Sequence, residues 1–236
     1  MSLLTIIQDA ADLIGLPRPQ FVVAATDPTT RQLLALANLE GKELARRYAW
    51  QELLKEATFT SVAAELQGTL ASIASDYGWA VSDTVWDRSQ TVPVNGPLSP
   101  QQWQALKSSN VSGPYGQYRI RDSKLYIIPA PTAGRSMAFE YVSKNWCQSS
   151  GGTAQSAWAA DTDTGILPEH LMTLGLRWRF KHSRGLSYAE DFRAYEMQVA
   201  NSQARGSGSG LLSLAGPASA DNYPGMRVPE GSWNIP

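Results

Sequence analysis

Apolar residues at the start of the chain recur at helical spacing. They are Leu3, Ile6, Ile7, Ala10, Leu13 and Ile14. Ser2, just before them, is a residue type that caps helices, and Gly15 followed by Pro17 is typical of a helix end. The pattern therefore predicts a first short helix between Ser2 and Gly15.

A second helix is predicted from a stronger start signal, Asp27 as N-cap and Pro28 as the first helical residue. An apolar stripe follows at three- and four-residue steps, formed by Leu34, Ala37, Gly41, Leu44 and Tyr48. We expect this helix to run to about Leu54.

After Lys55 the period changes from helical to alternating, as in Ala57, Phe59 and Ser61. Residues 118–127 predict a β-hairpin with its turn at Asp122–Ser123, and residues 136–141 predict a further strand. One short helix is expected to begin at Ser99–Pro100. Residues 56–150 therefore predict a β-rich unit.

Helical spacing returns after Pro168, where Leu171, Leu174 and Trp178 share one face and Gly185 closes the segment. A last helix is predicted over about residues 187–205. Its apolar stripe consists of Tyr188, Phe192, Tyr195 and Val199.

These elements indicate an α+β fold. We expect a discontinuous helical bundle formed by residues 1–55 and 160–205, with residues 56–150 inserted as a β-rich subdomain. The alternative is two side-by-side domains that meet near residue 150.

The helical and alternating patterns both end at residue 206. Residues 206–236 contain six Gly, five Ser and four Pro, and such a segment buries too little apolar surface to offset the entropy of ordering. Apolar side chains nevertheless recur along it, and we expect them to be anchors on a partner protein: Leu211, Leu212, Leu214, Tyr223, Met226, Trp233 and Ile235. Fully extended, this C-terminal tail would reach roughly 100 Å.

Composition narrows the function classes. Twenty Lys and Arg against 21 Asp and Glu give a formal charge of −1, whereas a general nucleic-acid binder carries a basic excess. Low charge density favours association between surfaces, and the eight Trp residues are suited to cores and interfaces. The chain start lacks the basic segment of a signal peptide, and no apolar run approaches the roughly 20 residues that span a bilayer. We expect no membrane association.

Residues that carry catalysis or bind metals are few. Residues 161–165 (DTDTG) resemble the start of a calcium loop, but the template's sixth and twelfth positions, Gly and Glu, are Ile166 and Met172 here. We interpret the segment as a turn, at which Asp161 or Asp163 could hold a loosely bound ion. His170, His182 and Cys147 are too few and too dispersed for a zinc site, and no nucleophile elbow is present. We expect no enzymatic activity and no cofactor.

Four cations lie within residues 177–184. Arg177, Lys181 and Arg184 are spaced by four and then three residues, which places them on one helix face. They either complement the dipole at a helix C-terminus or form a face that meets DNA or an acidic partner.

Several segments resemble the head-to-tail adaptor proteins of tailed bacteriophages, also called head–tail connectors or tail accessory factors. They are DTDTGILPEHLMTLGLRWR (residues 161–179), GLSYAEDF (185–192), LLALAN with GKELA (33–45) and, more weakly, GPLSPQQW (96–103). The resemblance spans about residues 1–205, rests on packing patterns and leaves out the tail.

The resemblance implies a structural virion protein at the neck between capsid and tail, made in the host cytoplasm. Such adaptors form a ring, usually dodecameric, between the portal protein and the tail nozzle or tail tube protein, and the genomic DNA leaves through its lumen. Their C-terminal segments commonly extend onto the portal. The alternative hypothesis is a DNA-binding module that uses the face of Arg177, Lys181 and Arg184.

Overall fold

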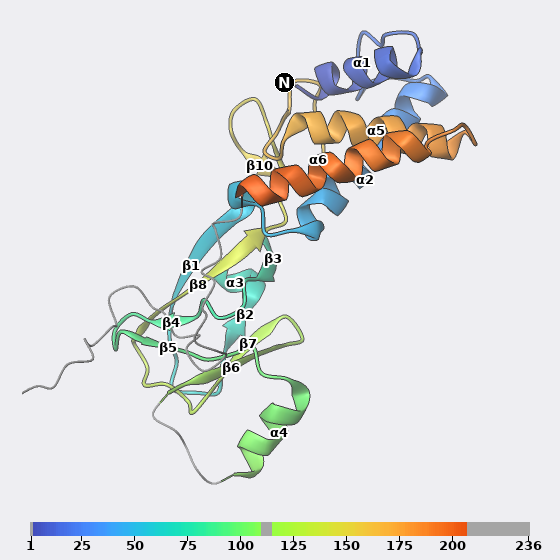
Figure 1. Ribbon diagram of the computed structural model, residues 1–236. Coiled ribbons are helices and arrows are strands. Elements are labelled where there is room, and N and C mark those ends of the chain that lie inside the picture. The colour runs from blue at the N-terminus through green and yellow to red at the C-terminus, as the bar shows by residue number, and fades with distance from the viewer. Residues whose placement is uncertain (1, 110–114, 207–236) are drawn as a thin grey trace, which may run out of the picture. The chain divides into compact units, whose positions relative to one another are not determined.

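The computed structural model describes residues 2–109 and 115–206 (Figure 1). Within these residues the chain forms six α-helices and eleven short strands, and the strands pair antiparallel in three sheets. The α+β class predicted from the sequence is confirmed.

The predicted starts of the first two helices are confirmed. Helix α1 covers Leu3–Ile14; the Ser2 side chain accepts from the Thr5 amide, and Gly15 ends the helix at φ 80°. Helix α2 covers Pro28–Arg47, with the Asp27 carboxylate accepting from the Thr30 amide at 2.8 Å. A left-handed backbone at Gly15 is a conformation that glycine adopts without steric cost.

The predicted end of the second helix, about Leu54, is wrong. Helix α2 ends at Arg47, a short 3₁₀ turn (Gln51–Leu53) follows, and Leu54 already begins strand β1. Trp50 is 3% exposed, and its indole Nε1 donates to the Leu44 carbonyl at 2.6 Å. Folding this large side chain back onto the last turn of the helix bends the chain away from the helix axis.

The two C-terminal helices lie side by side in Figure 1 and pack through aromatic side chains. Helix α5 covers Glu169–Ser183, and helix α6 covers Ala189–Gly206. The Trp178 ring of α5 contacts Phe192 and Tyr195 of α6, with centroids 5.0 and 6.1 Å apart. The aromatic stripe predicted for the last helix therefore faces α5.

The largest sheet is built around strand β8 (Ser136–Ser143). On one side β8 pairs with β1 (Leu54–Thr60). On the other it pairs with β3 (Tyr77–Ala80) and then with β4 (Trp86–Asp87), which in turn pairs with β5 (Val92–Pro93). Because residues alternate along a strand, Met137, Phe139 and Tyr141 share one face and Ala138 and Glu140 the other.

The predicted hairpin is confirmed as β6 (Gln117–Arg121) and β7 (Lys124–Ile128). Asp122 and Ser123 form its turn with φ values of 52° and 51°. Strand β2 (Leu66–Thr69) completes this sheet, and the short helix α3 (Leu70–Ile73) follows it. Helix α4 (Pro100–Ser108) begins with a capping box between Ser99 and Gln102, as expected from Ser99–Pro100.

A third small sheet joins β9 (Cys147–Gln148), β10 (Ala154–Gln155) and β11 (Thr164–Gly165). It leads the chain from β8 to α5. Trp146, just before it, is fully buried against Trp158, with ring centroids 5.1 Å apart.

Buried apolar residues form two clusters. The first unites α1, α2, α5 and α6 with Trp146 and Trp158. The second lies in the β-rich part, where Phe139 and Tyr141 of β8 meet Leu125, Ile127 and Tyr118 of the hairpin. Residues 1–206 form one compact unit by their contacts, and the finer subdomain boundaries stay a prediction.

Candidate functional site

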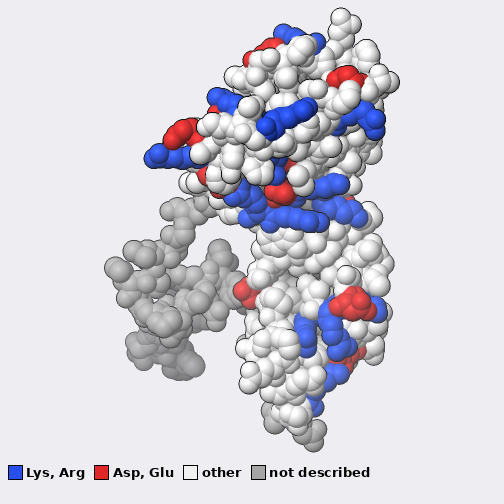
Figure 2. Space-filling view, turned by 90° about the vertical axis from the view of Figure 1, so that its right-hand side faces the viewer, with Lys and Arg blue, Asp and Glu red and all other residues white. Residues whose placement is uncertain are grey.

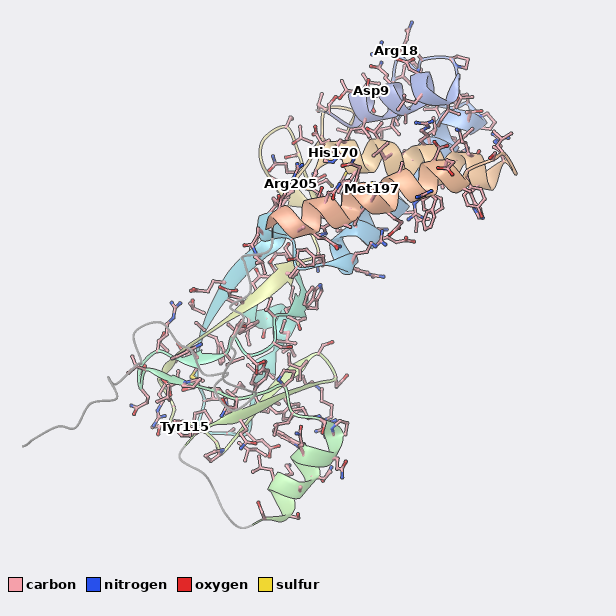
Figure 3. The ribbon with its side chains drawn as sticks, viewed as in Figure 1. Asp9, Arg18, Tyr115, His170, Met197 and Arg205 are labelled. Carbon is pink, nitrogen blue, oxygen red and sulfur yellow. The ribbon has the colours of Figure 1, made fainter. Side chains whose placement is uncertain are left out.

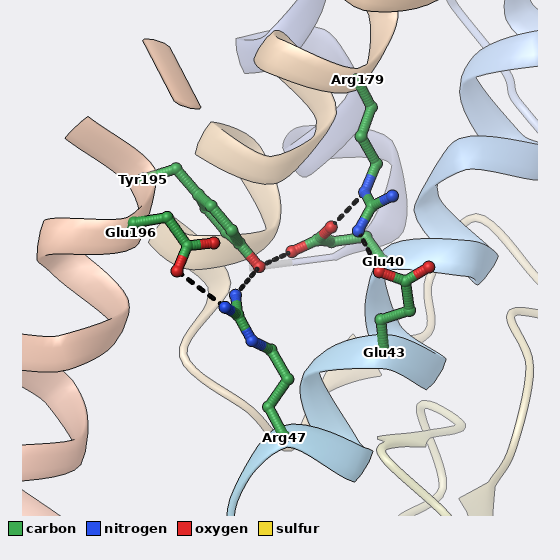
Figure 4. Close-up of polar contacts among 6 residues, drawn as sticks. All are labelled: Glu40, Glu43, Arg47, Arg179, Tyr195 and Glu196. Atoms are coloured by element: carbon green, nitrogen blue, oxygen red, sulfur yellow. Dashed lines mark hydrogen bonds and ion pairs between the residues drawn. The ribbon is translucent and has the colours of Figure 1, made fainter. Parts of the chain in front are cut away.

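The most deeply buried ionic group of the described residues is the carboxylate of Glu40, on the face of α2 that packs against α5 and α6 (Figure 4). Glu40 is 0% exposed. Its Oε2 accepts from Arg179 Nε of α5 at 2.5 Å, and its Oε1 accepts from the Tyr195 hydroxyl of α6 at 2.6 Å. One carboxylate thus joins three helices.

Two more ion pairs extend this network towards solvent. Arg179 Nη2 donates to Glu43 of α2, and Arg47 Nη2 donates to Glu196 of α6 at 2.7 Å. Arg47 Nη1 also donates to the Tyr195 hydroxyl at 3.4 Å. We call Glu40, Glu43, Arg47, Arg179, Tyr195 and Glu196 the three-helix network.

Room for the Glu40 carboxylate comes from Gly175 of α5. A Cβ atom at this position would lie 2.3 Å from Cδ of Glu40, far inside van der Waals contact. Glycine in the middle of a helix costs up to about 1 kcal/mol relative to alanine. Glycine is nevertheless required here, because the buried carboxylate of Glu40 occupies the space that a side chain would need.

Burial raises the pKa of Glu40, and the Tyr195 hydroxyl and the Arg179 guanidinium partly offset this by stabilising the ionised form. Burial also raises the pKa of Tyr195, with the Glu40 charge acting in the same direction. A carboxylate held by two good donors is a strong structural link. The network can fix the mutual orientation of α2, α5 and α6.

The prediction from the sequence did not include Glu40, although a signal was present. Glu40 lies three residues after Ala37 and four before Leu44, on the buried stripe of α2. A charged side chain on a buried stripe requires a partner of opposite charge. In the helix predicted after Pro168, Arg179 could supply that charge and Gly175 the space for the carboxylate.

The cations predicted to share one face are only partly open to a partner. Arg177 Nη2 lies 2.8 Å from Asp191 of α6, and Lys181 Nζ contacts the same carboxylate. Arg184 is exposed, with its guanidinium 5.3 Å from the centre of the Phe180 ring. Asp191 thus neutralises part of this face, and its role towards DNA or an acidic partner stays a prediction.

The acidic turn at residues 161–165 anchors the N-terminal segment of the chain. The Asp161 carboxylate accepts from the amides of Val22 and Val23 at 3.1 and 2.8 Å. The Asp163 carboxylate, 2% exposed, accepts from the amides of Ala159 and Ala160. The carbonyls of both aspartates bind the start of α1. Backbone amides thus bind both carboxylate oxygens of Asp161 and one of Asp163, in line with the interpretation of this segment as a turn.

Within the described residues, no group of three or more His, Cys, Asp or Glu side chains is placed to hold a metal ion. Cys147 is buried, as expected, and burial raises the pKa of its thiol to about 12. The His182 ring packs edge-on against Tyr188 with centroids 4.8 Å apart, while His170 lies at the start of α5.

The surface of the helical part carries a shallow apolar groove of about 680 Å³ between α1, α5 and α6. Leu13, Leu174 and His170 line it, and Figure 3 shows His170 together with Asp9 and the exposed Met197 on this side of the helices. The face of the molecule in Figure 2 also shows Lys and Arg side chains gathered across its middle. Both features are typical of contact surfaces.

The predicted tail anchors, from Leu211 to Ile235, lie outside the described residues. Of the described helices, none is long and apolar enough to cross a membrane.

The described residues thus form an α+β body whose helices are joined by a buried ionic network and whose surface carries an apolar groove and a group of cations. The family model of the SU10 adaptor protein matches residues 1–227. The chain therefore belongs to this family of phage adaptor proteins and is a virion component. The match extends past Gly206 into the tail, farther than the resemblance in the sequence reached. A search among curated proteins finds no match.

Proposed function

We propose that this protein forms a ring-shaped head-to-tail adaptor. In this proposal the ring, dodecameric as is usual for such adaptors, joins the portal protein to the tail nozzle or tail tube protein at the virion neck. Its lumen lets the genomic DNA pass. The role is structural rather than enzymatic.

The observation that carries the proposal is the family match, which covers nearly the whole chain. The three-helix network supports it physically. A subunit in the path of the genome must keep its shape under load, and Glu40 links three helices whose sequence positions are far apart. The C-terminal tail with its apolar anchors supplies the attachment to the portal.

The test is assembly with the phage's own portal protein. Purified full-length protein is mixed with portal rings, and the complex is examined by size-exclusion chromatography and by electron microscopy averaged around the ring axis. We expect a second ring stacked on the portal with an open lumen. If the protein stays separate from portal rings at micromolar concentrations, the proposal is wrong.

The alternative function is an independent DNA-binding module. The geometry gives it little support, because Asp191 pairs with two of the three cations proposed to bind DNA, Arg177 and Lys181. Such a module would bind duplex DNA with an affinity that falls steeply with salt. A filter-binding titration at two salt concentrations separates the two functions.

A further inference from the structure

Two surface depressions of opposite charge lie along strand β8. The acidic depression, of about 410 Å³, is lined by Glu56, Asp83 and Glu140 together with Trp86 and Arg88. The basic depression, of about 340 Å³, is lined by Lys42, Arg46 and Lys144 together with Tyr77, Trp79 and Trp146. Of the residues that the structure describes, no Asp or Glu lines the basic depression.

The acidic depression holds more negative charge than its own residues neutralise. Glu56 and Glu140 are directly opposite each other on β1 and β8, a like-charge pair that destabilises a sheet. Arg88 lies 2.6 Å from Glu56. The carboxylates of Asp83 and Glu140 are exposed and have no ion pair in the part of the chain that the structure describes.

The basic depression carries an excess of positive charge. Lys42 and Arg46 are four residues apart on α2, where like charges repel each other. Lys144 Nζ donates to the Ser75 carbonyl at 3.1 Å. None of the three cations has an ion pair among residues 2–109 and 115–206. The carboxylate of Asp76, which accepts a hydrogen bond from the Ser143 hydroxyl, is already paired with Lys55 and so does not neutralise these three cations.

The two depressions lie at different places along β8. Ala138, Phe139 and Glu140, in the middle of the strand, line the acidic depression. Ser143 and Lys144, at its end, line the basic depression together with Tyr77 and Trp79 of β3. The two depressions share no lining residue among the described residues, and no ion pair between described residues joins one to the other.

Opposite charges in two separate depressions of one subunit are suited to a head-to-tail contact between identical subunits, which closes into a ring when the rotation allows it. Trp79 lines the basic depression, is 38% exposed and offers an aromatic anchor of the kind that dominates interfaces. We propose that the basic depression of one subunit binds the acidic depression of the next, with Trp79 inserted between them. The inference rests on the proposed ring and names its subunit contact.

The test is a charge exchange in the full chain. One variant reverses the basic side (Lys42→Glu with Arg46→Glu) and a second reverses the acidic side (Asp83→Lys with Glu140→Lys). All four side chains are exposed, so circular dichroism and melting temperature should stay those of the wild type. Matched controls reverse exposed charges elsewhere, Arg31→Glu with Arg193→Glu and Glu52→Lys with Glu190→Lys.

Assembly on portal rings is measured by native mass spectrometry as the number of copies bound. We expect each depression variant alone to lose at least about tenfold in apparent association, because like charges then meet at every contact. An equimolar mixture of the two, or a chain with all four changes, should regain rings. The control pairs should assemble as the wild type does.

The inference is overturned if the two depression variants assemble as well as their controls, or if neither the mixture nor the fourfold variant recovers. That result leaves the adaptor function intact as long as the wild-type protein binds portal rings. Failure of the wild-type protein to bind portal rings would instead contradict the proposed function, and self-association of the charge variants at high concentration still tests the contact.

Discussion

At the scale of single residues, Gly175 determines whether the Glu40 carboxylate can stay inside the bundle. We predict that Gly175→Ala lowers the free energy of unfolding by about 1–3 kcal/mol, because the new methyl group overlaps with Glu40 and displaces it from Arg179 and Tyr195. Urea unfolding followed by circular dichroism measures this.

The matched control is Gly206→Ala at the end of α6, where a Cβ atom meets nothing within 4 Å. This variant should be as stable as the wild type or slightly more stable, because alanine favours helices over glycine. Equal stability of the two variants would contradict the role given to Gly175.

Asp76 supplies a pH-dependent contribution to stability. Burial by itself would raise its pKa, but hydrogen bonds from Lys55, Tyr141 and Ser143 outweigh that effect and lower the pKa from 3.8 to about 2. A carboxyl with a lowered pKa in the folded state stabilises the protein above its unfolded pKa, and this stabilisation is lost as the pH falls towards the folded pKa.

We therefore predict that Asp76→Asn melts at a lower temperature than the wild type at pH 7, and that the difference shrinks between about pH 4 and about pH 2. Differential scanning fluorimetry across this range measures it. Glu52→Gln, at an exposed position, should follow the wild type throughout. If the difference in melting temperature between Asp76→Asn and the wild type stays constant down to pH 2, Asp76 acts by packing alone.

At the scale of elements, local signals predicted five of the six described helices and four of the eleven described strands. Asp27 with Pro28, Ser99 with Pro100 and the Asp122–Ser123 turn act over a few residues, and the structure has each of them where expected. The end of α2 was missed because it depends on Trp50, whose indole binds the preceding turn and whose burial depends on distant residues.

The candidate site was less predictable for the same physical reason. Glu40 and Arg179 are 139 positions apart, so only the packing of α2 on α5 brings them together. The pairing of Arg177 and Lys181 with Asp191 likewise depends on how α6 folds back on α5. Spacing along one helix indicates which residues share a face but not what covers that face.

The turn at Asp161 attaches the N-terminal segment to the rest of the bundle. We predict that Asp161→Ala lowers the free energy of unfolding by about 1–3 kcal/mol, since the amides of Val22 and Val23 lose their acceptor. Amide hydrogen exchange should speed up at residues 22 and 23. Added calcium should change the stability of neither the variant nor the wild type; stabilisation of the wild type by calcium would instead support a loosely bound ion at this turn.

At the scale of the whole molecule, residues 1–206 form one compact unit, and the predicted anchors follow it in the sequence. We predict that a chain truncated after Gly206 keeps the melting temperature of the full protein but no longer attaches stably to portal rings. Co-sedimentation with portal rings measures the attachment.

A second variant keeps the full length of the tail but changes Leu211, Leu212, Tyr223 and Trp233 to Ser. It distinguishes the effect of the apolar anchors from the effect of the tail's length. It should also lose attachment, because buried aromatic and aliphatic anchors dominate such contacts. Full binding by the truncated chain would contradict the tail as tether.

The clustering of α1 and α2 with α5 and α6 in one core also has a consequence for synthesis on the ribosome. The N-terminal helices emerge first, but Leu3, Ile6 and Leu33 cannot be fully covered until α5 has left the exit tunnel, well over a hundred residues later. Contacts of such long sequence separation form slowly. Nascent chains should therefore expose an apolar N-terminal surface to chaperones until α5 has left the ribosome.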